Sequence, residues 1–156
     1  MRRLVPVLTA LLLVALLAAC GGSLKPLPAK EELAKTLTDA GIFSDELEAV
    51  DADIAAYLYG LTDAEGVEIG SWLSASGGTA EEITLFTCQN DEILKAVRDS
   101  VDARLDMQKR TYKDYAPAEV PKLEKAVVRV RDKVLIVCVS ADPEKAAKLL
   151  SPYFPA

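Results

Sequence analysis

Two stretches of the chain show the two-residue alternation of apolar and polar positions that is typical of β-strands. In residues 67–75, Val67, Ile69 and Leu73 alternate with polar or small residues, and a Gly-containing turn at 76–79 leads into residues 82–88, which are rich in Ile, Thr, Leu and Phe. These residues predict a β-hairpin. Residues 126–131 and 133–140 predict a second hairpin, and the continuous apolar run within 134–139 indicates a strand inside the sheet.

Other stretches show helical spacing. After Asn90, an N-cap residue, apolar residues step by three or four at Leu94, Val97, Val101 and Leu105. This predicts a helix of twenty or more residues, about 30 Å long. Shorter helices are predicted at 28–40, at 51–60 with Gly60 at its C-terminal end, at 117–124, and at 142–150 with Asp142 as its N-cap. Residues 44–50 fit either a helical face or an irregular apolar connector.

The order of these elements predicts the fold class. We expect an α+β domain with two layers, in which two β-hairpins form a four-stranded antiparallel sheet and the helices pack on one face.

The N-terminus predicts export. Arg2 and Arg3 precede an apolar run over residues 4–16, and Leu17-Ala18-Ala19-Cys20 follows. A single transmembrane anchor is the alternative, but the run is shorter than the ~20 residues that such a helix needs. The stretch resembles a bacterial lipoprotein signal. The resemblance implies cleavage before Cys20, diacylglycerol on its sulfur, and an extracytoplasmic protein anchored to the outer face of the plasma membrane, or to an outer membrane where the cell has one.

The mature chain is expected to be a lipidated cysteine and flexible linker over 20–29, followed by a single domain over 30–156. Without residues 1–19, 137 residues remain and the net charge changes from −6 to −8, because Arg2 and Arg3 are lost. An acidic surface makes nucleic acid an unexpected partner. It also repels anionic lipids, which favours a domain held away from the membrane by its linker.

Composition excludes several chemistries. The chain has no histidine, which removes Ser-His-Asp catalysis and histidine metal sites. Asp51 and Asp53 could be read as metal carboxylates, but Asp51 fits better as an N-cap. We expect no metal and no cofactor apart from the covalent lipid on Cys20.

Two cysteines remain after Cys20. In an exported protein, an even number of cysteines predicts a disulfide. A bridge requires Cα atoms within about 7 Å. If the long helix returns the chain so that the third predicted strand runs parallel to the second, Cys88 and Cys138 lie toward opposite ends of the sheet. We therefore expect two buried free thiols.

Several short motifs carry a family resemblance. They are the leader with its cysteine, Tyr57-x-Tyr59-Gly60-Leu61, Ala80-Glu81-Glu82-Ile83, Arg104-x-x-x-Gln108-x-x-x-Tyr112, and the strands ending near Ser140-Ala141-Asp142. Together they resemble an uncharacterised bacterial lipoprotein family, domain of unknown function number four-three-five-eight. The resemblance covers nearly the whole mature chain and implies location and fold, but no activity or catalytic residue.

Two functional classes remain open, and we favour the first. In the first, the protein is not an enzyme but a binding or assembly module that meets an envelope protein or polymer. Its candidate contacts are Tyr59, Gly60, Arg104, Gln108 and Tyr112. In the second, it is a hydrolase acting on a cell-wall component with paired carboxylates such as Glu68 and Glu82, which would have to lie about 5–10 Å apart.

Overall fold

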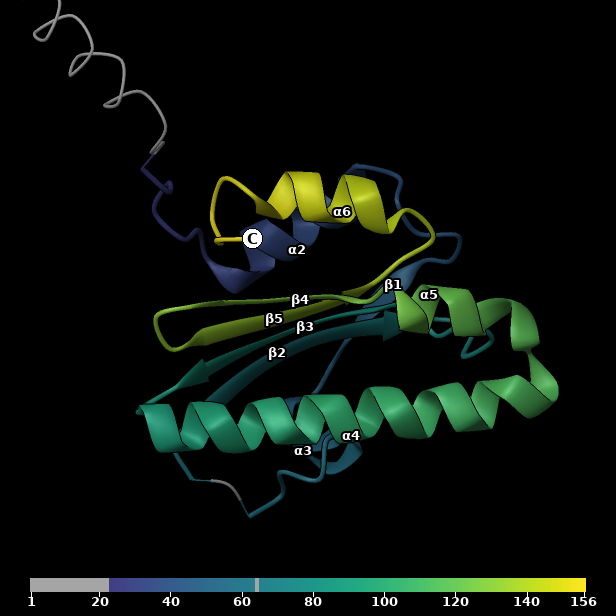
Figure 1. The fold of residues 1–156 in the computed structure, drawn as a ribbon, viewed down its shortest axis with the longest axis horizontal. Helices are drawn as coiled ribbons and strands as arrows, with labels where there is room; N and C mark the ends of the chain where they lie inside the picture. Colours follow the sequence, from purple (N-terminus) through teal and green to yellow (C-terminus); the bar gives the residue numbers. More distant parts are fainter. Residues whose placement is uncertain (1–22, 64) are drawn as a thin grey trace, which may run out of the picture.

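The computed structural model describes residues 23–63 and 65–156. The predicted leader and the lipidation site Cys20 lie outside the described residues. Figure 1 shows the elements in chain order. They are α2 (Lys30–Asp39), β1 (Leu47–Val50), α3 (Ala52–Leu58), β2 (Val67–Ser74), β3 (Glu82–Cys88), α4 (Asp91–Tyr115), the 3-10 turn η1 (Pro117–Glu119), α5 (Val120–Glu124), β4 (Val127–Arg131), β5 (Val134–Val139) and α6 (Pro143–Leu150).

The strands form one antiparallel sheet in the order β1-β2-β3-β5-β4. Both predicted hairpins are present, and β5 lies inside the sheet between β3 and β4, as its apolar run indicated. The prediction of four strands is wrong, because β1 pairs along the free edge of β2. This strand has four residues, too few to show a two-residue alternation that could be told from a helical face.

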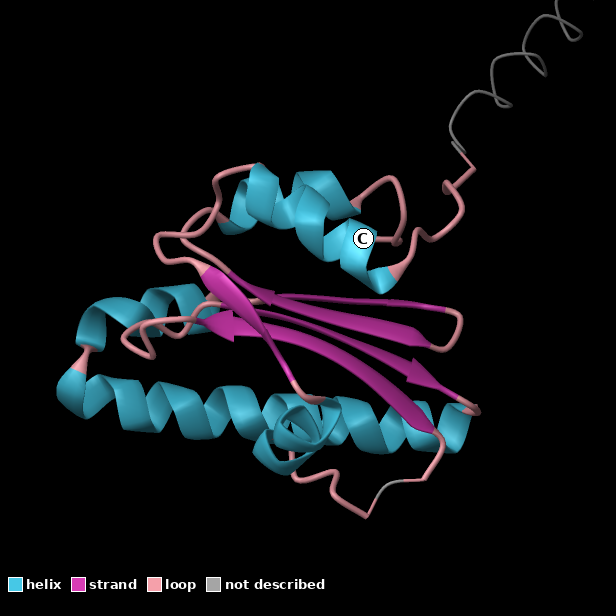
Figure 2. Cartoon of the chain, turned by 180° about the vertical axis from the view of Figure 1, so that it is seen from behind, coloured by secondary structure: helices cyan, strands magenta, loops and turns pink. Residues whose placement is uncertain are grey.

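The prediction that the helices share one face is also wrong. Helices α3 and α4 cover one face of the sheet, and α2 and α6 cover the other (Figures 1 and 2). The reason lies in the central strands β3 and β5, which carry apolar side chains on both faces. Phe86 and Val137 face α4, while Ile83 and Ile136 face α2 and α6. A strand that is apolar on both faces needs a layer of helices on each side.

Side-chain caps fix the starts of two helices. Asn90 Oδ1 accepts a hydrogen bond from the Ile93 backbone N–H at 2.9 Å, and Asp142 Oδ1 accepts one from Lys145 N–H at 2.9 Å. Both caps were predicted. Asp51 stands at the N-cap position of α3, but its side chain makes no capping hydrogen bond.

The predicted linker is attached to the domain over part of its length. The Lys25 backbone N–H donates to the Pro152 carbonyl at 2.7 Å, and Leu27 packs against the core between the sheet and α2. The stretch free to act as a linker is therefore shorter than expected. Among residues 23–63 and 65–156, no helix combines the length and apolar character needed to cross a membrane.

Cys88 and Cys138 are both buried and free, as expected. Cys88 pairs with Val67 at one end of β3, whereas Cys138 pairs with Ile83 near the other end. The two side chains also lie on opposite faces of the sheet, in the two separate core clusters. No disulfide can join them without rearranging the sheet.

Candidate functional site

A buried charged group joins the sheet to α3 and α4. Glu82 is the first residue of β3, and its carboxylate accepts a hydrogen bond from Arg104 Nη2 at 2.8 Å and another from the Tyr59 hydroxyl at 2.5 Å. The Arg104 guanidinium also lies 4.8 Å from the centre of the Tyr59 ring. Only 7% of Arg104 and 1% of Glu82 is exposed, so each charge depends on the other for compensation.

The local sequence explains how Tyr59 reaches this place. Helix α3 ends in a Schellman motif, in which the Leu61 N–H donates to the Ala56 carbonyl at 2.7 Å and the Gly60 N–H donates to Tyr57 at 3.0 Å. Gly60 has φ +67°, a conformation that favours glycine. The motif ends α3 so that Tyr59 turns into the core.

The surroundings shift the pKa values of two members of this group. Burial, followed by the charge of Glu82, raises the pKa of Tyr59 well above its usual value. Burial acts to lower the pKa of Arg104, but the charge and hydrogen bond of Glu82 outweigh it and raise this pKa. At neutral pH, Tyr59 is a neutral donor and Arg104 a cation, which are the states that the observed hydrogen bonds require.

A hollow of about 430 Å³ lies outside this group, between α3 and α4. Its lining residues are Tyr57, Leu58, Tyr59, Gly60, Ser100, Ala103, Arg104 and Met107. Tyr57 is 75% exposed and Met107 is 47% exposed. Aromatic and methionine side chains are enriched in protein–protein interfaces, and this surface exposes one of each.

The structure brings three of the five predicted contacts together here: Tyr59, Gly60 and Arg104. Gln108 is one turn further along α4, half-buried, and its Oε1 is buried without a hydrogen-bond partner. Tyr112 lies a further turn away and donates from its hydroxyl to the Thr79 carbonyl at 2.7 Å. Burial, followed by the neighbouring Tyr115, raises the pKa of Tyr112. The hydrogen bond from the Tyr112 hydroxyl to Thr79 links α4 to the β2–β3 turn.

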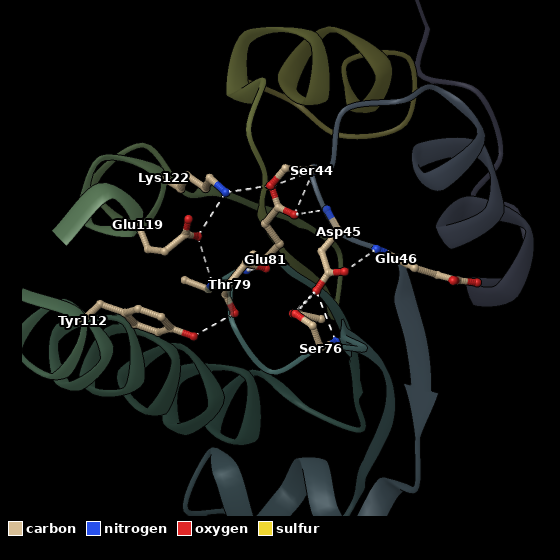
Figure 3. A network of polar contacts seen from close by, with 11 residues as sticks. Ser44, Asp45, Glu46, Ser76, Thr79, Glu81, Tyr112, Glu119 and Lys122 are labelled. Atoms are coloured by element: carbon tan, nitrogen blue, oxygen red, sulfur yellow. Dashed lines mark hydrogen bonds and ion pairs between the residues drawn. The ribbon is translucent and has the colours of Figure 1, made fainter. Parts of the chain in front are cut away.

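A second polar network, which the sequence motifs did not predict, lies at this end of the sheet (Figure 3). Glu81, 1% exposed, accepts hydrogen bonds from the backbone N–H groups of Ser44 and Asp45, each at 2.9 Å, and pairs with Lys122 Nζ at 3.1 Å. Burial acts to raise the pKa of Glu81, but the Ser44 N–H and Lys122 outweigh it, and the pKa is lowered.

Glu119 extends the network by pairing with Lys122 at 3.0 Å and accepting from the Ala80 N–H at 3.0 Å. Two adjacent glutamates opening a buried strand were the signal for these contacts, because consecutive strand residues point to opposite faces. Each of the two carboxylates therefore needed a partner on its own face of the sheet. The network links α5, the 44–45 segment and β3, which is a structural role.

The carboxylate pair considered for hydrolysis is not formed. Glu68 lies opposite Thr87, whereas Glu82 lies opposite Leu73, five residues further along β2. Five residues of strand span about 17 Å. The two side chains also leave opposite faces of the sheet, and the Glu82 carboxylate is bound to Arg104 and Tyr59. Within the part of the chain that the structure describes, no group of three or more acidic or cysteine side chains could hold a metal ion.

Comparison with known proteins adds the family. No curated protein and no solved structure matches the chain. A family model described as "Domain of unknown function (DUF4358)" matches residues 40–140. This range runs from the end of α2 to the end of β5 and includes every residue of the Glu82 group, the α3–α4 hollow and the Glu81 network. The chain therefore belongs to the DUF4358 family.

Proposed function

We propose that this protein is an extracytoplasmic lipoprotein, anchored through lipid on Cys20, whose domain binds a protein partner at the cell envelope. The leader sequence supports the anchor, since a basic start, an apolar run and small residues precede the cysteine. Diacylation would supply the two acyl chains that stable anchoring requires. The domain itself acts by binding, without catalysis.

One observation carries the binding role: Tyr57 and Met107 are exposed on either side of the α3–α4 hollow. Behind them, the charge of Arg104 is neutralised by Glu82. The hollow therefore presents an apolar rim to a partner, and its base carries no net charge. Such a surface suits a protein segment that inserts an apolar side chain. Helices α3 and α4 lie on the face of the sheet opposite to α2 and α6, where residues 25–27 attach (Figure 2). A partner can thus approach from the side away from the anchor.

The experiment is site-directed photocrosslinking in intact cells. A photoreactive residue replaces Tyr57 in one strain and Lys35 in the control strain; Lys35 is 73% exposed and lies on α2, on the other face of the sheet. We expect one envelope protein to be captured from position 57 alone, and the capture to be lost with Met107→Asp. Equal capture at both positions contradicts the proposed surface, and crosslinks to glycan alone identify an envelope polymer instead of a protein.

The anchor has its own test. Metabolic labelling with an alkyne fatty acid should mark the native protein and leave Cys20→Ala unlabelled, with the variant released from the membrane fraction. Membrane association and labelling that persist in Cys20→Ala would contradict lipidation at this residue.

A further inference from the structure

We propose that the domain rests on the membrane through a basic edge beside its anchor, and that the partner of this edge is an anionic lipid surface. The basic edge consists of Lys25, Arg129, Arg131, Lys133 and Lys148. This inference rests on the proposed lipid anchor and concerns how the anchored domain is oriented.

The segment that leads to the anchor leaves the domain at Lys25. The Lys25 backbone is held on both sides: its N–H donates to the Pro152 carbonyl at 2.7 Å, and its carbonyl accepts from Arg131 Nη1. Arg131 Nη1 also donates to the Tyr153 carbonyl at 3.0 Å. These bonds fix Lys25 against the edge strand β4 and the segment after α6.

The chain between Lys25 and a lipid on Cys20 is short. Five residue steps separate Lys25 from Cys20, and however they are arranged they span at most about 18 Å. A lipid on Cys20 therefore keeps Lys25 close to the headgroups. The nine-residue linker inferred from sequence would have allowed a greater distance, but more than half of it is attached to the domain.

Basic residues surround Lys25. Arg129 and Arg131 lie on the same side of β4, since they are two residues apart, and Lys133 follows in the β4–β5 turn. Lys148 lines a groove together with Pro152 and Tyr153, the segment that binds Lys25 and Arg131. Lys145, Asp142 and Glu144 line the same groove and add one positive and two negative charges. Lys25, Lys133 and Lys148 are exposed. Asp132, in the same turn, offsets one of these charges, and its carboxylate lies 3.6 Å from Arg131 Nε.

The chain as a whole is acidic, which argues for repulsion from anionic lipid. Charges are screened over about 8–10 Å in physiological salt, however, so the residues nearest the headgroups decide the sign of the interaction. Each lysine or arginine near an anionic membrane strengthens binding to that membrane by about fivefold. The basic edge therefore favours one orientation, in which the face of the sheet covered by α3 and α4, at the bottom of Figure 1, is turned away from the lipid. The start of α4 is the part of this face nearest the basic edge, because the Cys88 N–H donates to the Lys133 carbonyl at 2.8 Å.

The test supplies the anchor chemically, so that its outcome does not depend on lipidation in cells. The chain from Cys20 to Ala156 contains every helix and strand described here. It is coupled through the Cys20 thiol to maleimide lipid in vesicles of phosphatidylcholine, with or without phosphatidylglycerol. Lysine acetylation is then followed residue by residue by mass spectrometry. Lys113, exposed near the end of α4, is the internal reference.

We expect phosphatidylglycerol to slow labelling of Lys25, Lys133 and Lys148 by about fivefold or more and to leave labelling of Lys113 unchanged. High salt should abolish the difference. In the matched variants, Lys133→Glu with Lys148→Glu should remove the protection of Lys25, whereas Arg110→Glu with Lys113→Glu, an equal change in net charge on α4, should keep it.

Unchanged labelling of Lys133 and Lys148 would overturn the proposal, as would equal protection of Lys113. Either result would leave the anchor and the α3–α4 contact surface intact, because these are tested in cells.

Discussion

Glu81 and Glu82 are adjacent in sequence and both are 1% exposed, yet their carboxylates leave the start of β3 in opposite directions. Glu82 meets Arg104 and Tyr59 beneath α3 and α4, whereas Glu81 meets Lys122 and the backbone of residues 44–45. Each face of the sheet thus has one buried carboxylate with its own cation.

Arg104→Met should leave the Glu82 charge buried without its cation. We expect the free energy of unfolding to fall by about 3–5 kcal/mol, the usual cost of removing one partner of a buried ion pair. Replacing both residues with methionine should cost less than Arg104→Met alone, because no uncompensated charge remains. Denaturant unfolding measures both, with the exposed Arg98→Met on the same helix as the control, expected within about 0.5 kcal/mol of the native protein. A double variant less stable than Arg104→Met would contradict this account.

Glu81→Gln tests the second network through pH. The pKa of Glu81 is lowered in the folded protein, so its contribution is fully present above its ordinary value of 4.5 and is lost as pH falls below it. At neutral pH, we expect the substitution to cost about 1–3 kcal/mol, because Lys122 loses one of its two carboxylate partners and the N–H groups of Ser44 and Asp45 lose a charged acceptor. The difference from the native protein should shrink as pH falls through the ordinary glutamate range. Thermal unfolding across pH measures it, and Glu124→Gln, at an exposed position, is the control; a gap that stays constant would contradict the prediction.

Gly60→Ala tests the end of α3. A Cβ at this position would meet no atom within 4 Å, so the cost comes from φ +67° alone. We expect a loss of about 1–2 kcal/mol. Gly60→Asn should lose less, because asparagine adopts this conformation more readily. Unfolding midpoints compare the two, and equal losses for Ala and Asn would mean that backbone strain is not the cause.

Thiol counting tests the cysteines. In a Cys20→Ala chain, we expect no rapid reaction with a thiol reagent in the native state and two reactive thiols in denaturant without reductant. Burial raises the pKa of Cys88, and it raises that of Cys138 to about 12, so both stay protonated at neutral pH. The thiolate is the reactive form. Finding no thiol in denaturant would show a disulfide and contradict the free cysteines.

Much of the candidate site could be read from residue types and spacing. Gly60 at the end of the 51–60 helix and the Arg104-Gln108-Tyr112 stripe were visible, because each depends on contacts within a helix turn. Their partners were not visible. Glu82 was considered as an acid–base residue, yet it holds Arg104 and Tyr59, and Tyr112 bonds to Thr79 across the β2–β3 turn.

Periodicity and capping residues in the sequence determined both hairpins, the long helix and the α+β class, since these follow from local backbone preferences. Family membership also followed from its motifs. Only the tertiary structure decided that β1 extends the sheet and that helices cover both faces, because strand pairing and layer order depend on contacts between distant segments. It likewise decided that Lys25 is fixed between Pro152 and Arg131, residues more than 100 positions away in the chain.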